Sequence, residues 1–180
     1  MFEARRALVT VVAGLAAVLA GPACAAPPAV TVSADLPLRF GALLVPASGT
    51  RIVTSRGQVI DTGLFAIGED PVGPAQFTVT YDRGNESRRP IDVDVQVFLS
   101  GSGKVRIGAV EGELSQLESD IRSAGGGRDE PIVTLTLTDC RERRCSMTFR
   151  VGGRLDVLRT SGGAGLVIAL GATASVLAVR

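Results

Sequence analysis

Apolar and polar residues alternate strictly along several segments of the chain. Residues 91–99 (IDVDVQVFL) are the clearest case, because apolar side chains occupy every second position and Asp92, Asp94 and Gln96 stand between them. Successive side chains of a β-strand point to opposite faces of a sheet, so this pattern predicts a half-buried strand. Unpaired carboxylates are costly to bury, which places the acidic face of the strand toward water.

The same two-residue period recurs before and after this segment. It is clear in residues 77–82 (FTVTYD), 132–139 (IVTLTLTD) and 145–151 (CSMTFRV), and weaker in residues 50–55, 58–63, 104–110 and 153–158. Segments rich in glycine and polar residues separate these candidates and are typical of turns, and one of them is the pair Gly152 and Gly153. The chain is therefore predicted to be all-β and antiparallel, with its strands stacked as a β-sandwich.

One segment breaks the alternation. In residues 111–127 (EGELSQLESDIRSAGGG), Leu114, Leu117 and Ile121 follow one another at spacings of three and four. This spacing places them on one face of about three helical turns, and the glycine run after them is typical of a helix end. The sequence thus predicts one short helical insertion between strands.

Residues 30–41 (VTVSADLPLRFG) begin with an alternating apolar face made by Val30, Val32 and Ala34. Pro37 has no backbone N–H and belongs at a strand edge or break, so it divides the segment. We interpret residues 26–35 as an N-terminal arm and candidate donor strand, and residues 36–180 as the domain, whose own first strand is in residues 36–44. A first strand that stays in its own sheet explains the same alternation.

Residues 165–179 are apolar or small, without a single charge. A membrane-spanning helix needs about 20 apolar residues, so this segment is short for one. Two buried strands hinged near Gly171 fit the segment better, and a membrane anchor is the alternative interpretation.

The first 25 residues have the organisation of a secretory signal peptide. A short basic start is followed by the apolar run ALVTVVAGLAAVLAG, and Ala23, Cys24 and Ala25 supply small residues for cleavage after Ala25. We therefore expect an exported chain of 180 − 25 = 155 residues, located in the periplasm, on the outer surface or outside the cell. This length is that of one ordinary domain.

The composition argues against several classes of function. Histidine and tryptophan are absent, and loss of Glu3, Arg5 and Arg6 with the leader leaves 17 basic and 17 acidic residues. A neutral chain lacks the basic surface that binds nucleic acid, and without histidine the commonest metal ligand and general base is missing. No segment matches a catalytic motif, so we predict no enzyme, catalytic residue, cofactor, metal site or small-molecule substrate. A pair of carboxylates is the one catalytic arrangement left open.

Cys140 and Cys145 are the two cysteines that remain after the expected cleavage. Four residues separate them in a chain expected to enter an oxidising compartment, which predicts a disulfide at a hairpin end. Closing so short a loop stabilises by only about 2 kcal/mol in chain-entropy terms, so the bond is expected to hold the register of the hairpin. The charged loop between the cysteines, residues 141–144, is expected to be solvated.

Residues 36–63 (LPLRFGALLVPASGTRIVTSRGQVIDTG) and 149–158 (FRVGGRLDVL) carry a resemblance to known proteins. The chain resembles a family of secreted bacterial domains of unknown function, which is similar in plan to spore coat protein U and the chaperone-usher pilins. The resemblance rests on Leu38, Phe40, Gly41, Gly49, Thr50, Gly57, Gly63, Val151, Gly152, Leu155 and Val157. It implies an immunoglobulin-like, pilin-like β-sandwich. The chain departs from those families in its ending, GATASVLAVR, and in its local pair of cysteines.

These observations lead to one expected function. Pilin-type subunits complete one another by strand addition, in which an N-terminal extension donates alternating apolar side chains to the next subunit. We expect an exported structural or adhesive subunit of the bacterial cell envelope that assembles into a fimbria-like polymer, with copies of itself or other envelope subunits as partners. The alternative is a non-enzymatic envelope protein tethered to the membrane by residues 165–179.

Overall fold

The computed structural model describes residues 26–45, 48–101, 103–107, 110–121, 132–159 and 164–180. None of these residues is helical, and the strand pairs that they form are all antiparallel. The prediction of an all-β, antiparallel fold is confirmed. The expected signal peptide, residues 1–25, lies outside the described residues.

The strands follow one another along the chain with short connections. Their bounds are β1 (Ala29–Leu36), β2 (Leu38–Leu44), β3 (Gly49–Val53), β4 (Val59–Thr62), β5 (Phe65–Ala66), β6 (Val72–Gly73), β7 (Ala75–Asp82), β8 (Ile91–Ser100), β9 (Gly103–Ile107), β10 (Val110–Ser119), β11 (Ile132–Cys140), β12 (Arg144–Arg159), β13 (Ala164–Ile168) and β14 (Gly171–Val179).

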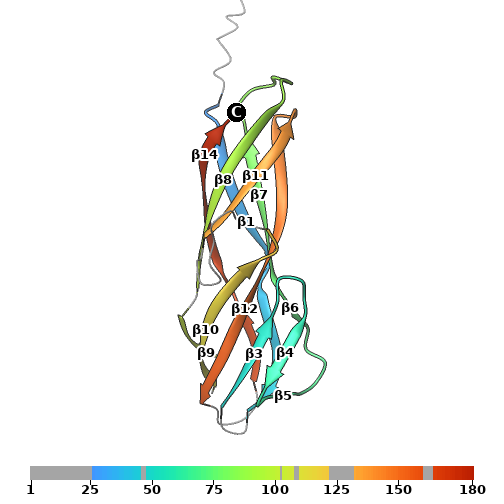
Figure 1. Ribbon diagram of the computed structural model, residues 1–180, viewed down its shortest axis with the longest axis vertical. Coiled ribbons are helices and arrows are strands. Elements are labelled where there is room, and N and C mark those ends of the chain that lie inside the picture. Colours follow the sequence, from blue (N-terminus) through green and yellow to red (C-terminus); the bar gives the residue numbers. More distant parts are fainter. Residues whose placement is uncertain (1–25, 46–47, 102, 108–109, 122–131, 160–163) are drawn as a thin grey trace, which may run out of the picture.

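The molecule is elongated, and two groups of strands follow one another along its long axis (Figure 1). In the group that we call the terminal half, β1, β7 and the first part of β12 form one sheet, and β11, β8 and β14 form another. In the group that we call the distal half, the second part of β12 pairs with β3 and β10, whose outer neighbours are β4 and β9. The remaining strands, β13, β2, β5 and β6, form the third sheet.

The chain passes from one half to the other at several places. β12 runs through both halves without a break, while β1 gives way to β2 at Pro37 and β13 gives way to β14 at residues 169–170. We call the level of these two breaks the waist. The break at Pro37 is where the missing N–H predicted it.

Apolar side chains from all three sheets form one buried cluster. The predicted alternation holds in β7, where every second residue is buried, and along the middle of β8. Phe77 of β7 and Phe149 of β12 lie directly opposite each other near the waist, and their rings stack with centroids 5.5 Å apart. This ring stack adds a side-chain contact to the backbone pairing of β7 and β12.

The helical insertion predicted for residues 111–127 is wrong in the described part of that segment. Val110–Ser119 form strand β10, which pairs with β9 and β12. The pairing with β12 is irregular around Gln116, whose φ is +50°. Such a bulge adds a residue to the strand, so Leu114 and Leu117 are both buried although they are three positions apart. A bulged strand therefore produced the apolar spacing of a helix.

The turn predicted at Gly152 and Gly153 is also wrong, because both glycines lie inside β12. A Cβ atom on Gly152 would lie only 2.5 Å from the backbone nitrogen of Ser55. Glycine is needed at this position because another segment of backbone passes too close for any side chain. The pair marks a close approach of two strands and not a change of direction.

Residues 165–179 form most of β13 and all of β14, and the break between these strands ends one residue before Gly171. β13 pairs with β2, and β14 pairs with β8. Among the described residues there is no helix of the length and apolar character needed to cross a membrane.

Candidate functional site

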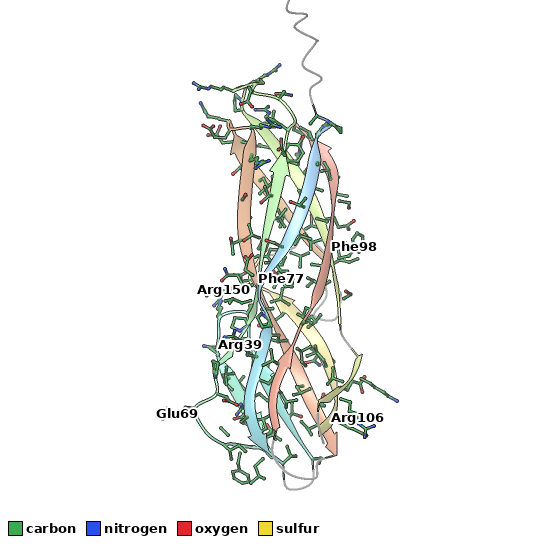
Figure 2. All side chains as sticks on the ribbon, turned by 180° about the vertical axis from the view of Figure 1, so that it is seen from behind. Arg39, Glu69, Phe77, Phe98, Arg106 and Arg150 are labelled. Carbon is green, nitrogen blue, oxygen red and sulfur yellow. A yellow bond between two sulfur atoms is a disulfide. The ribbon has the colours of Figure 1, made fainter. Side chains whose placement is uncertain are left out.

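Strands β1 and β14 lie side by side in the terminal half, as the blue and red strands of Figure 2 show, but they do not pair. In the described part of the chain, β1 pairs with β7 alone and β14 with β8 alone. Beyond the waist the chain segments that continue them, β2 and β13, do pair, with Leu38 opposite Ile168. The boundary between β1 and β14, which we call the seam, therefore consists of two strand edges without a backbone ladder.

The residues assigned to strand exchange lie on the inner side of this seam. The register of β1 places Val30, Val32 and Ala34 opposite three buried residues of β7. Val30 and Val32 pack against the core and are partly buried, whereas Ala34 is exposed. Their apolar face is thus directed toward the core of their own chain. Exchange between chains stays a prediction.

The inner face of β14 is less covered than that of β1. Val176 and Val179 lie opposite buried valines of β8, yet they are 38% and 50% exposed. No residue of Gly171–Val179 is charged. Natural edge strands are usually protected from further pairing by charges, proline or a covering segment. β14 has an apolar edge without such charges.

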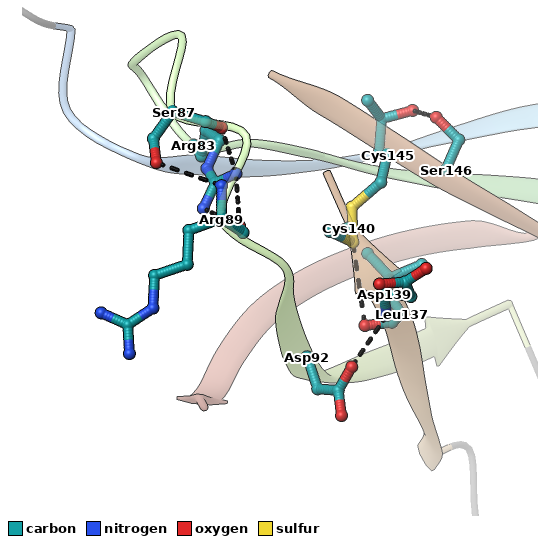
Figure 3. Close-up of a disulfide and its surroundings, with 10 residues drawn as sticks. Arg83, Ser87, Arg89, Asp92, Leu137, Asp139, Cys140, Cys145 and Ser146 are labelled. Carbon is teal, nitrogen blue, oxygen red and sulfur yellow. Dashed lines mark hydrogen bonds between the residues drawn. A yellow bond between two sulfur atoms is a disulfide. The ribbon is translucent and has the colours of Figure 1, made fainter. Parts of the chain in front are cut away.

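The opposite side of the terminal half is closed by the disulfide. Cys140 at the end of β11 is bonded to Cys145 near the start of β12, which confirms the predicted bond (Figure 3). The hairpin expected around it is wrong, because β11 and β12 lie in different sheets and do not pair with each other. β11 and β12 are the outer strands of the two sheets on that side, as β14 and β1 are at the seam. The two sheets are therefore joined covalently along one side, while the seam has only side-chain packing.

The charged residues at the free end of the terminal half pair with one another. Arg143 and Arg144 both bind the carboxylate of Asp82, at 3.1 Å and 2.9 Å, and Arg143 also reaches Glu86. Arg83 is buried and donates hydrogen bonds to the carbonyl oxygens of Ser87 and Arg89 (Figure 3). These arginines hold the loops at this end together.

Asp82 makes the stability of this end dependent on pH. Hydrogen bonds from Arg144, from the backbone N–H of Gly84 and from Arg143 lower its pKa from 3.8 to about 2. A carboxylate whose pKa is lower in the folded chain stabilises the fold above its ordinary pKa and loses that contribution as the pH falls toward the folded value.

We expect stability to fall as the pH is lowered from about 5 to about 2, and Asp82→Asn to make that fall shallower. Urea unfolding of the two proteins at each pH measures the difference. Part of the slope remains in the variant, because hydrogen bonds also lower the pKa of Asp35, Asp94 and Asp156, chiefly those from Thr78, Thr136 and Arg154. Equal slopes for the variant and the natural protein would contradict the assignment.

Comparison with known families identifies the domain. Residues 30–167 match the family described as "Domain of unknown function (DUF4402)", a span that begins inside β1 and ends inside β13. The chain belongs to the DUF4402 family. No curated protein and no solved structure matches the chain. The predicted membership of a family of unknown function is confirmed, and the similarity to spore coat protein U and pilins stays a prediction.

Within the DUF4402 domain, the residues that carried the resemblance lie mainly in the distal half and support its packing. Leu38, Phe40 and Leu155 are fully buried. Thr50 donates a hydrogen bond of 2.5 Å to Asp156 on the neighbouring strand. These residues stabilise the domain and do not form a chemical site.

Three glycines of the resemblance, Gly41, Gly49 and Gly152, lie where the DUF4402 domain has no room for a side chain. Gly41 has a φ of +68°, and a Cβ atom there would lie 2.7 Å from Val72. A Cβ atom on Gly49 would overlap the side chain of Leu64, and Gly152 faces backbone. Each glycine therefore permits a close approach, which explains its place in the motif.

An ion pair between a buried arginine and an exposed aspartate in the distal half was missed by the sequence analysis. Arg51 on β3 binds both carboxylate oxygens of Asp61 on β4 at 2.6 Å, and it also donates to the carbonyl oxygen of Phe40. The two residues are directly opposite in the strand pair. Arg51 occupies an inward position in the pattern of β3, and that position was the one signal that could have identified it.

The described part of the chain contains no candidate metal site. No group of three histidine, cysteine, aspartate or glutamate side chains is placed to hold a metal ion there. The seam is one place where edge strands offer unpaired backbone to a partner.

Proposed function

We propose that the protein is an exported structural or adhesive subunit of the cell envelope, with a pilin-like sandwich, that assembles by exchanging strand β1 between copies. The observation that supports this is the seam, where two adjacent edge strands lie without backbone pairing. Exchange needs no cofactor, because backbone hydrogen bonds and apolar contacts supply the binding.

Strand β1 has features of an exchangeable element. A single ladder to β7 holds it, and Pro37 alone separates it from β2. Val30 and Val32 are only partly buried, so detachment exposes less new apolar surface than release of a central strand. Elements with few buried contacts open at the lowest free-energy cost.

An exchanged β1 would form the same interactions in the neighbouring copy. The edge of β7 that pairs with its own β1 accepts an identical strand in the same register, with Val32 opposite Val79. Domain swapping of this kind costs little, because every hydrogen bond and apolar interaction that breaks within one chain forms again between two chains. Repetition of the exchange from copy to copy yields a linear polymer.

Paired cysteines test the exchange directly. Thr31 and Thr80 lie opposite each other on β1 and β7, so a Thr31→Cys, Thr80→Cys variant should form a disulfide across this strand pair. After refolding at high protein concentration, we expect ladders of covalently linked copies on a non-reducing gel. The ladders form because β1 of one copy pairs with β7 of another.

The matched control uses two strands that the proposal leaves within one chain. Thr78 on β7 and Thr148 on β12 are also directly opposite, so the Thr78→Cys, Thr148→Cys variant should give monomers only. If both variants give monomers while light scattering detects multimers, or if no multimers form at any concentration, the proposed exchange is wrong. Export is checked separately by the mass of the secreted chain, which should begin at Ala26.

A further inference from the structure

A cavity of about 220 Å³ opens on the surface at the waist. Its walls come from the connection between β1 and β2, from the residues around β6, and from β7 and β12. Pro37, Pro71 and Pro74 form the rigid part of the wall, and Arg39 and Arg150 stand beside them. Figure 2 shows both arginines on the same side of the waist. We call this cavity the waist pocket.

The two arginines of the waist pocket differ from most of the other arginines that the structure describes. Arg51, Arg106, Arg141, Arg143, Arg144, Arg154 and Arg180 each pair with a carboxylate. Within the described residues, the guanidinium groups of Arg39 and Arg150 have no ion pair and no hydrogen bond. Two unpaired cations at one cavity form a site ready for an anion.

Two of the acidic residues near the waist pocket already accept hydrogen bonds. Asp35 accepts hydrogen bonds from Ser33 and Thr78, and Asp120 accepts the backbone N–H of Arg150. Neither Glu69 nor Asp70, which precede Pro71, forms an ion pair with a described residue. Among the described residues, Arg39 and Arg150 therefore have no carboxylate within ion-pair distance.

The walls of the waist pocket restrict the kind of anion. Proline has no backbone N–H, so the three prolines present apolar ring surface and no donors. The exposed side chains of Leu36 and Val72 add further apolar surface. Two guanidinium groups match the two oxygens of a carboxylate. Gln76 is the remaining polar side chain of the lining, so most of the wall suits a carbon body better than the further oxygens of a phosphate. The cavity is also smaller than pockets for drug-sized ligands, which are about 300–1,000 Å³.

We propose that the waist pocket binds a carboxylate group attached to a small apolar body, with Arg39 and Arg150 holding the carboxylate and the prolines contacting the body. Two sources carry this chemistry: the acidic side chain of an extended protein segment and a free small carboxylic acid. This proposal rests on other observations than strand exchange does, and neither arginine belongs to β1 or β14, although Leu36 and Pro37 at the end of β1 also line the pocket.

Titrations followed by nuclear magnetic resonance test this proposal. The probes are acetyl-Ala-Glu-Ala-amide, its glutamine counterpart, sodium acetate and inorganic phosphate, and the readout is the backbone amide signals of Gly73 and Arg150. We expect the glutamate peptide to shift these signals saturably and the glutamine peptide not to do so. Arg39→Gln and Arg150→Gln should each weaken binding at least about tenfold, because each removes a charge-assisted hydrogen bond.

Arg89→Gln is the matched control, since Arg89 is an exposed arginine whose guanidinium has no ion pair among the described residues and lies outside the pocket. It should bind like the natural protein, and all three variants should keep the natural melting temperature. Acetate that binds as well as the glutamate peptide identifies a free acid as the ligand, and weaker acetate binding identifies a protein segment. Equal binding of the glutamine peptide or of phosphate, or equal binding by the pocket variants and Arg89→Gln, overturns the proposal.

Discussion

Asp61→Ala is expected to lower the free energy of unfolding by about 3–5 kcal/mol, because it leaves a buried guanidinium without its counter-ion. Arg51 is only 2% exposed and receives its charge compensation from the carboxylate of Asp61. The carbonyl oxygen of Phe40 is the remaining partner of the guanidinium, and it carries no charge. Denaturant unfolding monitored by circular dichroism measures the loss.

Asp156→Ala provides a matched control for this change. Asp156 pairs with Arg154 in the same half of the molecule, and both aspartates are 31% exposed. Arg154, however, is 36% exposed, so water can replace the lost carboxylate. Exposed ion pairs are worth about 0–1 kcal/mol, and Asp156→Ala should cost little more than its hydrogen bond from Thr50. Equal losses in the two variants would show that burial of the partner is not decisive.

Phe149→Ala is expected to cost about 3–5 kcal/mol, the usual loss when a buried aromatic side chain is removed from a core. Its ring is 1% exposed and stacks on Phe77, with an angle of 22° between the ring planes. The change removes this stack and leaves a cavity next to the waist, where the two halves share β12. Denaturant unfolding should give both the midpoint and the m-value, which is the slope of the unfolding free energy against denaturant concentration. If the two halves no longer unfold together, the m-value falls as well.

Phe98→Ala is the corresponding control, since Phe98 lies on β8 of the same half but is 42% exposed. An exposed ring packs against few neighbours, so its removal should change stability by no more than about 0.5 kcal/mol. A double-mutant cycle on Phe77 and Phe149 isolates the stacking contribution, which is expected to be about 0.5–1.5 kcal/mol. A Phe149→Ala loss no larger than that of Phe98→Ala would contradict the assigned core.

The seam and the waist pocket place two different interaction modes on one small domain. The seam offers backbone edges to an identical strand, and the waist pocket offers two unpaired arginines to a carboxylate. The tests of the two proposals do not depend on each other. Covalent ladders report exchange of β1 even if no probe binds the pocket, and the titration reports the pocket even in a protein that stays monomeric.

Prediction from sequence succeeded where structure is set by neighbours along the chain. The alternating residues 77–82 and 91–99 lie in β7 and β8, as the pattern predicted. Pro37, which has no backbone N–H, lies at the break between β1 and β2. Cys140 and Cys145 were close enough in sequence for the short connection between β11 and β12 to bring them together, although these strands lie in different sheets and do not form the expected hairpin. In each case the decisive interaction spans only a few residues, so the pattern is visible in the sequence.

Prediction failed where contacts with a segment distant in sequence determine the local structure or burial. Leu114 and Leu117 share a buried face because of a bulge in the pairing with β12, and their spacing alone imitates a helix. Gly152 resembles a turn glycine until the backbone of Ser55 is placed beside it. Arg51 looks like a surface charge on a strand until Asp61 and Phe40 enclose it.

The sequence by itself determined that this chain is built from antiparallel strands, where most of them lie, and which cysteines bond, because periodicity, proline and short-range closure act within a few residues. Only the tertiary structure decided that β1 and β14 lie together unpaired, that Arg39 and Arg150 meet at one cavity, and that Arg51 is buried. These arrangements depend on which strands become neighbours. That choice is made by packing of the whole core, which no local pattern encodes.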